Sequence, residues 1–317
     1  MKKKLFAALM LVSIPVSAFV TDYVHYLPLK GWALKPGKEH FYVQAYTKML
    51  NSQHTFNSSG DKITLTQYFN IAGAQPHITK NIHVLDASLG LSSRFGVQVI
   101  VPYVTNYRLH ANGSGENEGE MLVGDSGIGD IDLILWFGRT QLSRGRFVFS
   151  GRYHMTNGTS PYRLSSTDGI TGVNQPLATG LGYSYLSLDV KGDVRLYRSI
   201  WLSGMAGYRY NRYFVENGYE ATSKMGDIVT LAARAKYEGR IVTASLATGW
   251  VMSLKNISEG YEREGTDRAF VSLFPQIGVS VPWLSFVDLI HAGYVIPLAG
   301  KNIVSTDYFV LGVDFKF

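Results

Sequence analysis

Two residues in one short segment have the types and spacing of a general base and a nucleophile. His154 precedes Thr156 by two positions in the run Tyr153-His154-Met155-Thr156-Asn157-Gly158. In a β-strand, side chains at positions i and i+2 lie on the same face, so the imidazole could accept the proton of the threonine hydroxyl. This pair is a candidate for hydrolytic chemistry.

Candidate metal ligands are less well organised than that pair. Glu116, Glu118, Glu120 and Asp125 lie in one glycine-rich segment. They could bind a divalent cation or bridge to lipopolysaccharide, although carboxylates in such loops are more often simply solvated. The remaining histidines show no metal-ligand spacing. Because the chain has no cysteine, thiolate metal sites, disulfides, thiol nucleophiles and a cysteine-linked lipid anchor are excluded. We therefore predict no metal and no cofactor.

Composition then limits the class of protein that could carry these residues. The chain has 317 residues with 33 glycines and 20 tyrosines, and no apolar run of transmembrane-helix length follows its N-terminus, which excludes a helical membrane protein. The formal net charge is +6, but three of the charges are Lys2, Lys3 and Lys4, and about +3 on the rest is too weak a bias to indicate nucleic acid. A water-soluble β protein or a membrane barrel remains.

Alternation of apolar and polar residues predicts about twelve strands, an even number, as bacterial single-chain barrels require. Most are long enough to cross a bilayer when tilted, which takes ~9–11 residues. The predicted strands cover residues 38–50, 79–91, 96–108, 127–138, 146–156, 180–193, 200–213, 226–237, 240–252, 268–281, 287–297 and 306–317.

The predicted connections fall into two classes of length. Short turns follow the even-numbered strands, whereas the odd-numbered strands are followed by longer polar connections over residues 51–78, 109–126, 157–179, 214–225, 253–267 and 298–305. Short turns at one end and long loops at the other are typical of outer-membrane barrels. The alternative, a soluble sandwich of half-buried strands, gives no reason for this segregation.

The faces of the strands support the same interpretation. Near residue 231, Leu231 and its neighbours at every second position are apolar, while Arg234 and Lys236 share the opposite face. A slip of one residue would turn both cations toward lipid, at ~2–4 kcal/mol each near the midplane. The last strand alternates in the same way up to a terminal aromatic residue, Phe317, as the closing strand of a barrel would.

Assigning the polar face of each strand to the interior gives a set of lumen-lining candidates. The functional interpretation is a polar passage with aromatic stacking faces, and the alternative is that the charges pair and fill the interior. The candidates are Lys48, Asp86, Arg108, Asp130, Asp132, Arg152, His154, Asp189, Lys191, Arg209, Arg234, Lys236, Asp314 and Lys316, with Tyr42, Tyr46, Tyr183, Tyr185, Phe270 and Phe274.

The N-terminal region divides into two parts. Three lysines, an apolar run and small residues at Val16-Ser17-Ala18 predict a secretory signal peptide over residues 1–18. Residues 19–37 are too apolar to hang in the periplasm, and we expect them in or against the barrel mouth, with Tyr23, Tyr26 and Trp32 as constriction candidates. The alternative is a tether packed beneath the barrel.

Two motifs resemble a known family. Residues 84–108, with the turn near Arg94 and the pair Pro102-Tyr103, resemble the strand, turn and strand of the barrels grouped under the meta-pathway of phenol degradation. Gly127-Ile128-Gly129-Asp130 resembles that family's Gly-x-Gly-Asp strand opening, whereas its Pro-Thr-Gly is represented only by Thr156-Asn157-Gly158. The resemblance implies an outer-membrane barrel, distantly similar to long-chain fatty-acid transporters, that passes small hydrophobic or aromatic compounds.

A second resemblance concerns the histidine pair. The run 153–158 resembles the His-x-Ser-Asn-Gly of outer-membrane phospholipase A, a twelve-stranded barrel. Here the nucleophile position holds Thr156, a hindered alcohol, and the predicted register turns His154 and Thr156 to the lumen, away from lipid substrate. We therefore expect no enzyme, and a His154 paired with a neighbouring carboxylate.

Together these patterns predict an all-β protein, a single closed antiparallel transmembrane β-barrel over residues 38–317, in the cell outer membrane. The expected function is passive uptake of small hydrophobic or aromatic compounds, and the alternative is a non-transporting surface barrel such as an adhesin-like scaffold. Expected partners are outer-membrane lipid and lipopolysaccharide, the barrel-assembly machinery through the strand ending at Phe317, and a small-molecule solute. No nucleic acid is expected.

Overall fold

The computed structural model describes residues 41–65, 67, 77–92, 94–111, 120–123, 126–142, 145–158, 181–215 and 222–317. The predicted signal peptide and the segment 19–37, with Tyr23, Tyr26 and Trp32, lie outside the described residues. In the part of the chain that is described, no helix is long and apolar enough to cross a membrane.

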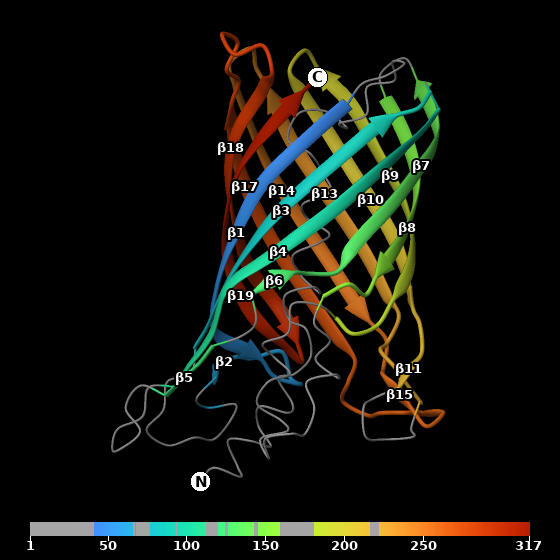
Figure 1. Ribbon diagram of the computed structural model, residues 1–317, viewed down its shortest axis with the longest axis vertical. Coiled ribbons are helices and arrows are strands. Elements are labelled where there is room, and N and C mark those ends of the chain that lie inside the picture. The colour runs from blue at the N-terminus through green and yellow to red at the C-terminus, as the bar shows by residue number, and fades with distance from the viewer. Residues whose placement is uncertain are drawn as a thin grey trace.

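Twelve long strands form one closed antiparallel barrel (Figure 1), which confirms the predicted fold class. Each strand pairs with its neighbours along the chain, and β19 pairs with β1 to close the wall. The strands are β1 (Phe41–Phe56), β3 (His77–Gly90), β4 (Phe95–Ala111), β7 (Ile131–Leu142), β8 (Gly145–Met155), β9 (Tyr185–Tyr197), β10 (Ile200–Asn211), β13 (Ile228–Glu238), β14 (Val242–Ser253), β17 (Arg268–Val279), β18 (Val287–Lys301) and β19 (Ile303–Lys316).

Seven short strands lie beyond or beside the long ones. β2 (Lys62–Thr64) pairs with β1, and both β5 (Glu120–Val123) and β6 (Gly127–Ile128) pair with β4. A separate four-stranded sheet joins β11 (Phe214–Val215), β12 (Thr222–Lys224), β15 (Ile257–Ser258) and β16 (Tyr261–Glu262). Strands β2, β5, β11 and β15 lie at the lower end of the barrel in Figure 1, where the longer connections are.

The connections differ in length as predicted, with one exception. At one end, at most seven residues separate consecutive long strands, as at 198–199, 239–241 and 280–286, and longer segments separate them at the other. The predicted loop 298–305 is wrong, because β18 and β19 meet with Asn302 alone between them. The alternation of apolar and polar residues stops at this point, but the backbone remains paired. Gly300 pairs with Phe270, and Ile303 pairs with Phe56. Asn302 turns the chain at φ 51°, a left-handed conformation that asparagine tolerates.

The start of the sixth long strand also differs from the prediction. Residues 180–193 were expected to form it, but β9 runs over Tyr185–Tyr197. Gly182 has φ 80°, which turns the chain before pairing begins. Tyr183 therefore lies just outside the strand, on the irregular segment that enters it.

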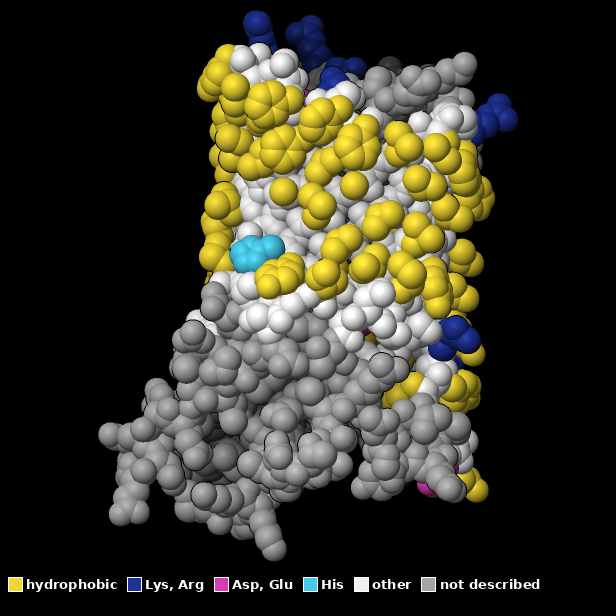
Figure 2. Space-filling model, viewed as in Figure 1, with side chains coloured by type: hydrophobic (Ala, Val, Ile, Leu, Met, Phe, Trp, Pro, Cys, Tyr) yellow, Lys and Arg dark blue, Asp and Glu magenta, His cyan; other side chains and the backbone are white. Residues whose placement is uncertain are grey.

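The two faces of the wall are chemically opposite. In β13, Leu231 is 46% exposed on the outside while Arg234 is 3% exposed on the inside. Figure 2 shows the exterior covered with hydrophobic side chains over the height of the barrel, with Lys and Arg gathered at the end where the short turns lie. An apolar exterior band of this kind is what a barrel presents to acyl chains.

Interior glycines make room for large side chains on the next strand. A Cβ added to Gly96 would lie 1.9 Å from the ring of Trp136, its cross-strand partner. A Cβ on Gly312 would lie 2.6 Å from Nε2 of His291. Both side chains can therefore lie flat along the wall.

The pairing between β4 and β7 is interrupted. The two strands pair only from Phe95 to Ile100, after which the chain bends around Pro102. Gly129 N–H donates to the carbonyl of Pro102 (2.9 Å) and the pairing resumes through β6. Proline has no N–H to give to the ladder, and Asp130 lies at the resulting bend.

Candidate channel interior

A buried cluster of opposite charges lies where β7 and β8 meet. Imidazole nitrogens of His154 lie 2.7 Å from Oδ1 of Asp132 and 3.1 Å from Oδ2 of Asp130. Arg152 Nη1 lies 3.5 Å from the second oxygen of Asp132. Cross-strand pairing sets this geometry, because Asp132 is directly opposite His154. The expected pairing of His154 with a neighbouring carboxylate is present.

Asp130 also anchors the two ends of a long connection. Its Oδ1 accepts the N–H of Gly158 (2.9 Å) and its Oδ2 accepts the N–H of Leu181 (2.5 Å). Gly158 follows β8 and Leu181 precedes β9. One carboxylate at the bend of the wall therefore fixes where the chain leaves the barrel and where it returns.

Next to this cluster is a stack of a cation and aromatic rings. The His154 and Tyr185 rings are stacked, with centroids 4.3 Å apart, and the Arg209 guanidinium lies 3.6 Å from the Tyr185 ring centroid. Arg209 also donates to the Tyr183 hydroxyl (3.2 Å) and, through Nε, to Asn211 (2.7 Å). Such stacks gain strength when they are desolvated, and all of these side chains are buried.

The network continues toward β13 through Asn211 and Asp227. Asn211 N–H donates to Asp227 Oδ1 (3.0 Å), while Lys224 Nζ and the Tyr208 hydroxyl reach Oδ2 at 2.9 and 2.8 Å. Stacked and hydrogen-bonded side chains therefore extend from the start of β7 to the start of β13.

Deeper in the barrel, charges face one another across several strands. Asp86 on β3 accepts two hydrogen bonds from Gln98 at 2.8 Å and interacts electrostatically with Arg152 and Lys191, on β8 and β9. Lys236 pairs with Glu238 at 2.7 Å. Asp314 on β19 accepts from Gln44 (3.0 Å) and lies 3.2 Å from His291.

Most of the lumen-lining candidates are buried in the barrel. Tyr46 is half-buried against the interior apolar cluster. Lys316 pairs with the buried Tyr42 at the end of β19 and is exposed. The Arg108 side chain lies outside the described residues. The buried candidates are Tyr42, Lys48, Asp86, Asp130, Asp132, Arg152, His154, Tyr183, Tyr185, Asp189, Lys191, Arg209, Arg234, Lys236, Phe270, Phe274 and Asp314.

Several buried polar residues did not figure among the candidates. Lys80 lies an even number of positions from Asp86, and Asp193 lies an even number from Asp189. Strict alternation therefore places both on the interior face. His291 lies an even number of positions from Leu289 and Val295 in β18, so the same rule places it on the interior face. Arg268, Lys224 and Asp227 lie at or next to strand ends. Apolar–polar alternation does not extend far enough there to show which face a side chain is on.

The hydrolytic pair predicted as a candidate is not assembled. β8 ends at Met155, so Thr156 leaves the strand and is exposed, while His154 is buried. Both imidazole nitrogens contact carboxylates rather than the Thr156 hydroxyl. The prediction that Thr156 shares the lumen face with His154 is therefore wrong. Among the described residues no group of His, Asp and Glu could hold a metal ion.

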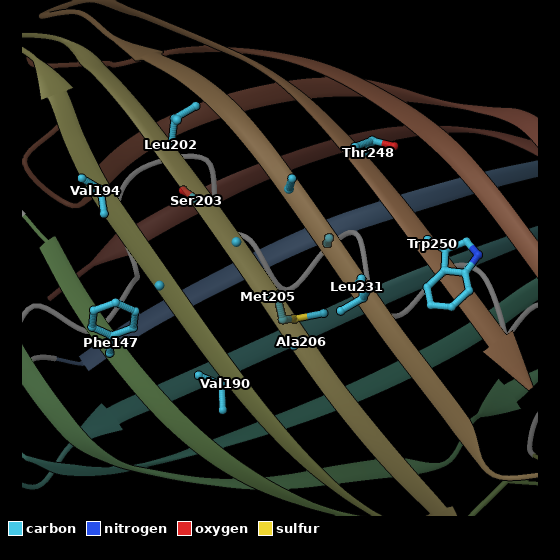
Figure 3. Close-up of a pocket in the computed structure, with 14 residues that line it drawn as sticks. Phe147, Val190, Val194, Leu202, Ser203, Met205, Ala206, Leu231, Thr248 and Trp250 are labelled. Atoms are coloured by element: carbon cyan, nitrogen blue, oxygen red, sulfur yellow. The ribbon is translucent and has the colours of Figure 1, made fainter.

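A shallow apolar depression of about 670 Å³ lies elsewhere, on the wall from β8 to β14 (Figure 3). Small residues such as Gly204 and Ala233 form its floor, between larger side chains that include Phe147, Leu231 and Trp250. Because Phe147 and Leu231 are exposed on the outside of the barrel, this depression belongs to the apolar exterior and not to the buried charges.

Comparison with known proteins supports the fold alone. No protein-family model and no curated protein matches this chain. A solved outer membrane channel from Pseudomonas putida F1 is similar with a TM-score of 0.67 and 12% identity, over 89% of this chain and 96% of that one. The NanC porin has a TM-score of 0.49 and 8% identity, over 87% and 100% of the two chains. The channel shares the architecture of this chain, and the resemblance to the phenol-degradation family stays a prediction.

Proposed function

We propose that this protein is a passive channel of the cell outer membrane that admits small hydrophobic or aromatic compounds. The observation that carries the proposal is the inversion of the wall, apolar outside and charged inside, as Leu231 and Arg234 of β13 illustrate. A barrel whose interior is polar suits passage of solutes, whereas a soluble barrel would bury its apolar face. Aromatic side chains, among them Tyr183, Phe270 and Phe274, lie inside the barrel together with these charges.

The closing strand fits the proposed partners. Phe317 N–H donates to the carbonyl of Phe41 (3.1 Å), and the two rings lie 5.7 Å apart at the seam of the barrel. Phe317 is 63% exposed, so its ring is accessible to the barrel-assembly machinery. Outer-membrane lipid and lipopolysaccharide are the partners of the apolar exterior.

A non-transporting scaffold is the second candidate, because the interior charges are buried and many of them pair with one another. Single-channel conductance and liposome swelling distinguish the two. The channel predicts solute permeation by the purified protein. Absence of permeation for every solute, including after deletion of residues 19–37, would favour the scaffold.

The proposal includes no enzymatic activity. His154 is held between Asp130 and Asp132, away from the exposed Thr156. A phospholipid hydrolysis assay with the purified barrel tests this directly. Phospholipid hydrolysis that is lost in a His154→Ala variant would contradict the proposed channel function and would favour a phospholipase.

A further inference from the structure

The end of the barrel with the short connections is rich in arginine and poor in carboxylates. None of the residues that separate consecutive long strands at this end is Asp or Glu. Four of these connections contain one arginine each, namely Arg94, Arg144, Arg198 and Arg240. Figure 2 shows Lys and Arg side chains projecting from this end. Positive charge is therefore concentrated at one end of the barrel.

The arginines that the structure describes in these connections are free to meet a partner. Arg94, Arg198 and Arg240 are exposed, and no ion pair joins them to an Asp or Glu of the described residues. The carboxylates at the neighbouring strand ends face interior cations instead. Glu238 pairs with Lys236 at 2.7 Å, and Asp193 interacts electrostatically with Lys236 and Arg234.

Cations at the opposite end of the barrel lie beside carboxylates. Lys255 Nζ lies 2.7 Å from a carboxylate oxygen of Glu264, and Lys301 Nζ lies 2.6 Å from one of Asp267. Further exposed carboxylates at this end are those of Asp61, Glu259 and Glu262. Negative charge offsets positive charge there, so the excess of positive charge belongs to the short connections and not to the whole surface.

Two of the arginines belong to neighbouring connections that the backbone joins. The N–H of Glu238 donates to the carbonyl of Ser199 (2.7 Å). Arg198 precedes Ser199, and Arg240 follows Glu238 by two positions. Nε of Arg195 donates to the carbonyl of Arg198 (2.8 Å) and so holds this connection in place. The two connections are two strand spacings apart, about 10 Å. We call Arg198 and Arg240 the arginine pair.

Exposed apolar side chains adjoin the arginine pair. Tyr197 and Ile200 flank Arg198, and Tyr237 and Ile241 flank Arg240. The Arg198 guanidinium lies 5.8 Å from the centre of the Tyr197 ring. Cations next to aromatic and aliphatic side chains, at the end of an apolar wall, suit a membrane–water interface. The apolar parts meet acyl chains there, and the cations meet headgroups.

An exposed tryptophan lies at the same end of the barrel. Trp283, in the connection 280–286, is 77% exposed. Tryptophan is enriched at membrane–water interfaces, because its ring is apolar and its N–H is polar. This residue supports the same level in the membrane for the short connections, independently of the arginines.

We propose that the arginine pair is a docking site for the headgroups of anionic phospholipids such as phosphatidylglycerol. Each guanidinium donates to phosphate oxygens, and the acyl chains lie along the exposed side chains beside the pair. A zwitterionic headgroup carries its own cation and gains less from two arginines. This assignment rests on the proposed membrane barrel and adds a preference among lipids at one of its ends.

Electron spin resonance of spin-labelled lipids tests the preference. The full-length barrel is reconstituted in phosphatidylcholine vesicles. Traces of phosphatidylglycerol and phosphatidylcholine, each labelled on an acyl chain, are then compared. The signal of lipid immobilised at the barrel gives the association constant of each lipid.

The expected preference follows from the charge of arginine near a membrane surface, which changes affinity about fivefold at low salt. Averaged over all the lipids that contact the barrel, this gives about a twofold preference for phosphatidylglycerol. At about 0.5 M salt the preference should nearly disappear, because screening weakens exposed charges. Equal association of the two lipids at low salt would overturn the proposal.

Variants locate the preference. Arg198→Gln combined with Arg240→Gln should remove at least half of it, whereas Arg198→Lys combined with Arg240→Lys keeps the charges and should keep most of it. Lys62→Gln combined with Arg263→Gln removes two exposed cations at the opposite end and should change nothing. An equal loss in that control would overturn the assignment to the arginine pair. If the double glutamine variant does not fold, Arg240→Gln alone must lower the preference.

Two soluble ligands exclude other occupants. Glycerol phosphate has the phosphate of the headgroup without acyl chains, so it should not abolish the preference. Abolition would indicate a site for soluble phosphate and overturn the lipid. Binding of polyglutamate that the double glutamine variant loses, together with equal association of the two lipids, would indicate an acidic protein partner and also overturn the proposal.

Conductance in phosphatidylcholine bilayers separates this inference from the channel. Conductance without a lipid preference would leave the channel and overturn the docking site. A lipid preference without conductance would leave the docking site and overturn the channel. Absence of both would overturn both proposals.

Discussion

Asp130 Oδ2 and His154 Nε2 lie 3.1 Å apart inside the barrel, and the same oxygen accepts the backbone N–H of Leu181. The residue just before β7, the end of β8 and the approach to β9 therefore meet at one carboxylate. An ionised carboxylate has acceptor sites for all of these donors at once. This contact couples the charges of the interior to the chain entering and leaving the wall.

Replacing Asp130 by asparagine removes that coupling. The amide has one acceptor oxygen in place of two, so Gly158 and Leu181 cannot both keep their bonds, and the partner of His154 loses its charge. We expect Asp130→Asn to lower the free energy of unfolding by about 1–3 kcal/mol. Urea titration of the folded barrel in detergent, followed by tryptophan fluorescence, measures this. Glu259→Gln, at an exposed turn, is the control and should change nothing measurable.

The close approach of Trp136 to Gly96 predicts a steric effect. Any Cβ at position 96 would overlap the indole ring, whose atoms begin 1.9 Å away. Gly96→Ala should destabilise the barrel by about 1–3 kcal/mol, because a packed interior resists added volume. In Gly204→Ala the nearest atom to the new Cβ is 3.8 Å away, so this variant should be near neutral.

A double variant checks the cause. If the indole ring is the obstacle, Gly96→Ala should cost less when Trp136 is already replaced by leucine, and the two effects should not add. Additive effects would attribute the loss to the backbone at position 96. Unfolding midpoints of the four proteins complete the cycle.

The lipid-facing assignment is tested by placing a charge on the exterior. Leu231 lies mid-strand on the outside, whereas Tyr213 lies beyond the end of β10 and is also exposed. Leu231→Arg should cost about 2–4 kcal/mol in lipid vesicles and Tyr213→Arg about 0–1 kcal/mol. Equal small costs at both positions would show that water and not acyl chains surrounds the wall.

The fold could be predicted from sequence because a strand has a period of two. Alternation alone gave the face of Asp132, His154 and Arg234, since a slip would have placed charges in lipid. It could not give the partners of these residues. The bond from Leu181 to Asp130 joins positions 51 apart, and it forms where the pairing of β4 with β7 stops short of Pro102 and the chain turns at Gly182. Pairings of this kind depend on register between strands, which local pattern does not encode.

The same limit explains the errors at strand ends. The Asn302 turn was predicted as a loop because polar and small residues surround it, although backbone pairing continues to Lys301 and resumes at Ile303. Thr156 was assigned to the lumen by extending a period of two past Met155, where the strand stops.

The ion pair between Asp267 and Lys301 predicts that the stability of the barrel depends on pH. This pair lies at the end of the barrel with the longer connections. Lys301 Nζ lies 2.6 Å from Asp267 Oδ2, and this hydrogen bond lowers the pKa of the Asp267 carboxyl in the folded protein. A carboxyl whose pKa is lower when folded stabilises the protein above its unfolded-state pKa of about 3.9. That contribution is lost as the pH falls through the lower, folded-state value. Both side chains are partly exposed, so the contribution should stay below about 1 kcal/mol.

Asp267→Asn should therefore unfold at slightly lower urea than the wild type at pH 7. The gap between the two midpoints should close as the pH is lowered below the folded-state pKa, because the wild-type carboxyl then becomes neutral as well. High salt at pH 7 should also narrow the gap, since screening weakens exposed pairs. Glu259→Gln, which also removes one negative charge at an exposed position of the same connection, controls for net charge. A gap that persists unchanged at low pH would mean that Asp267 acts through packing, because only its ionised form can pair with Lys301.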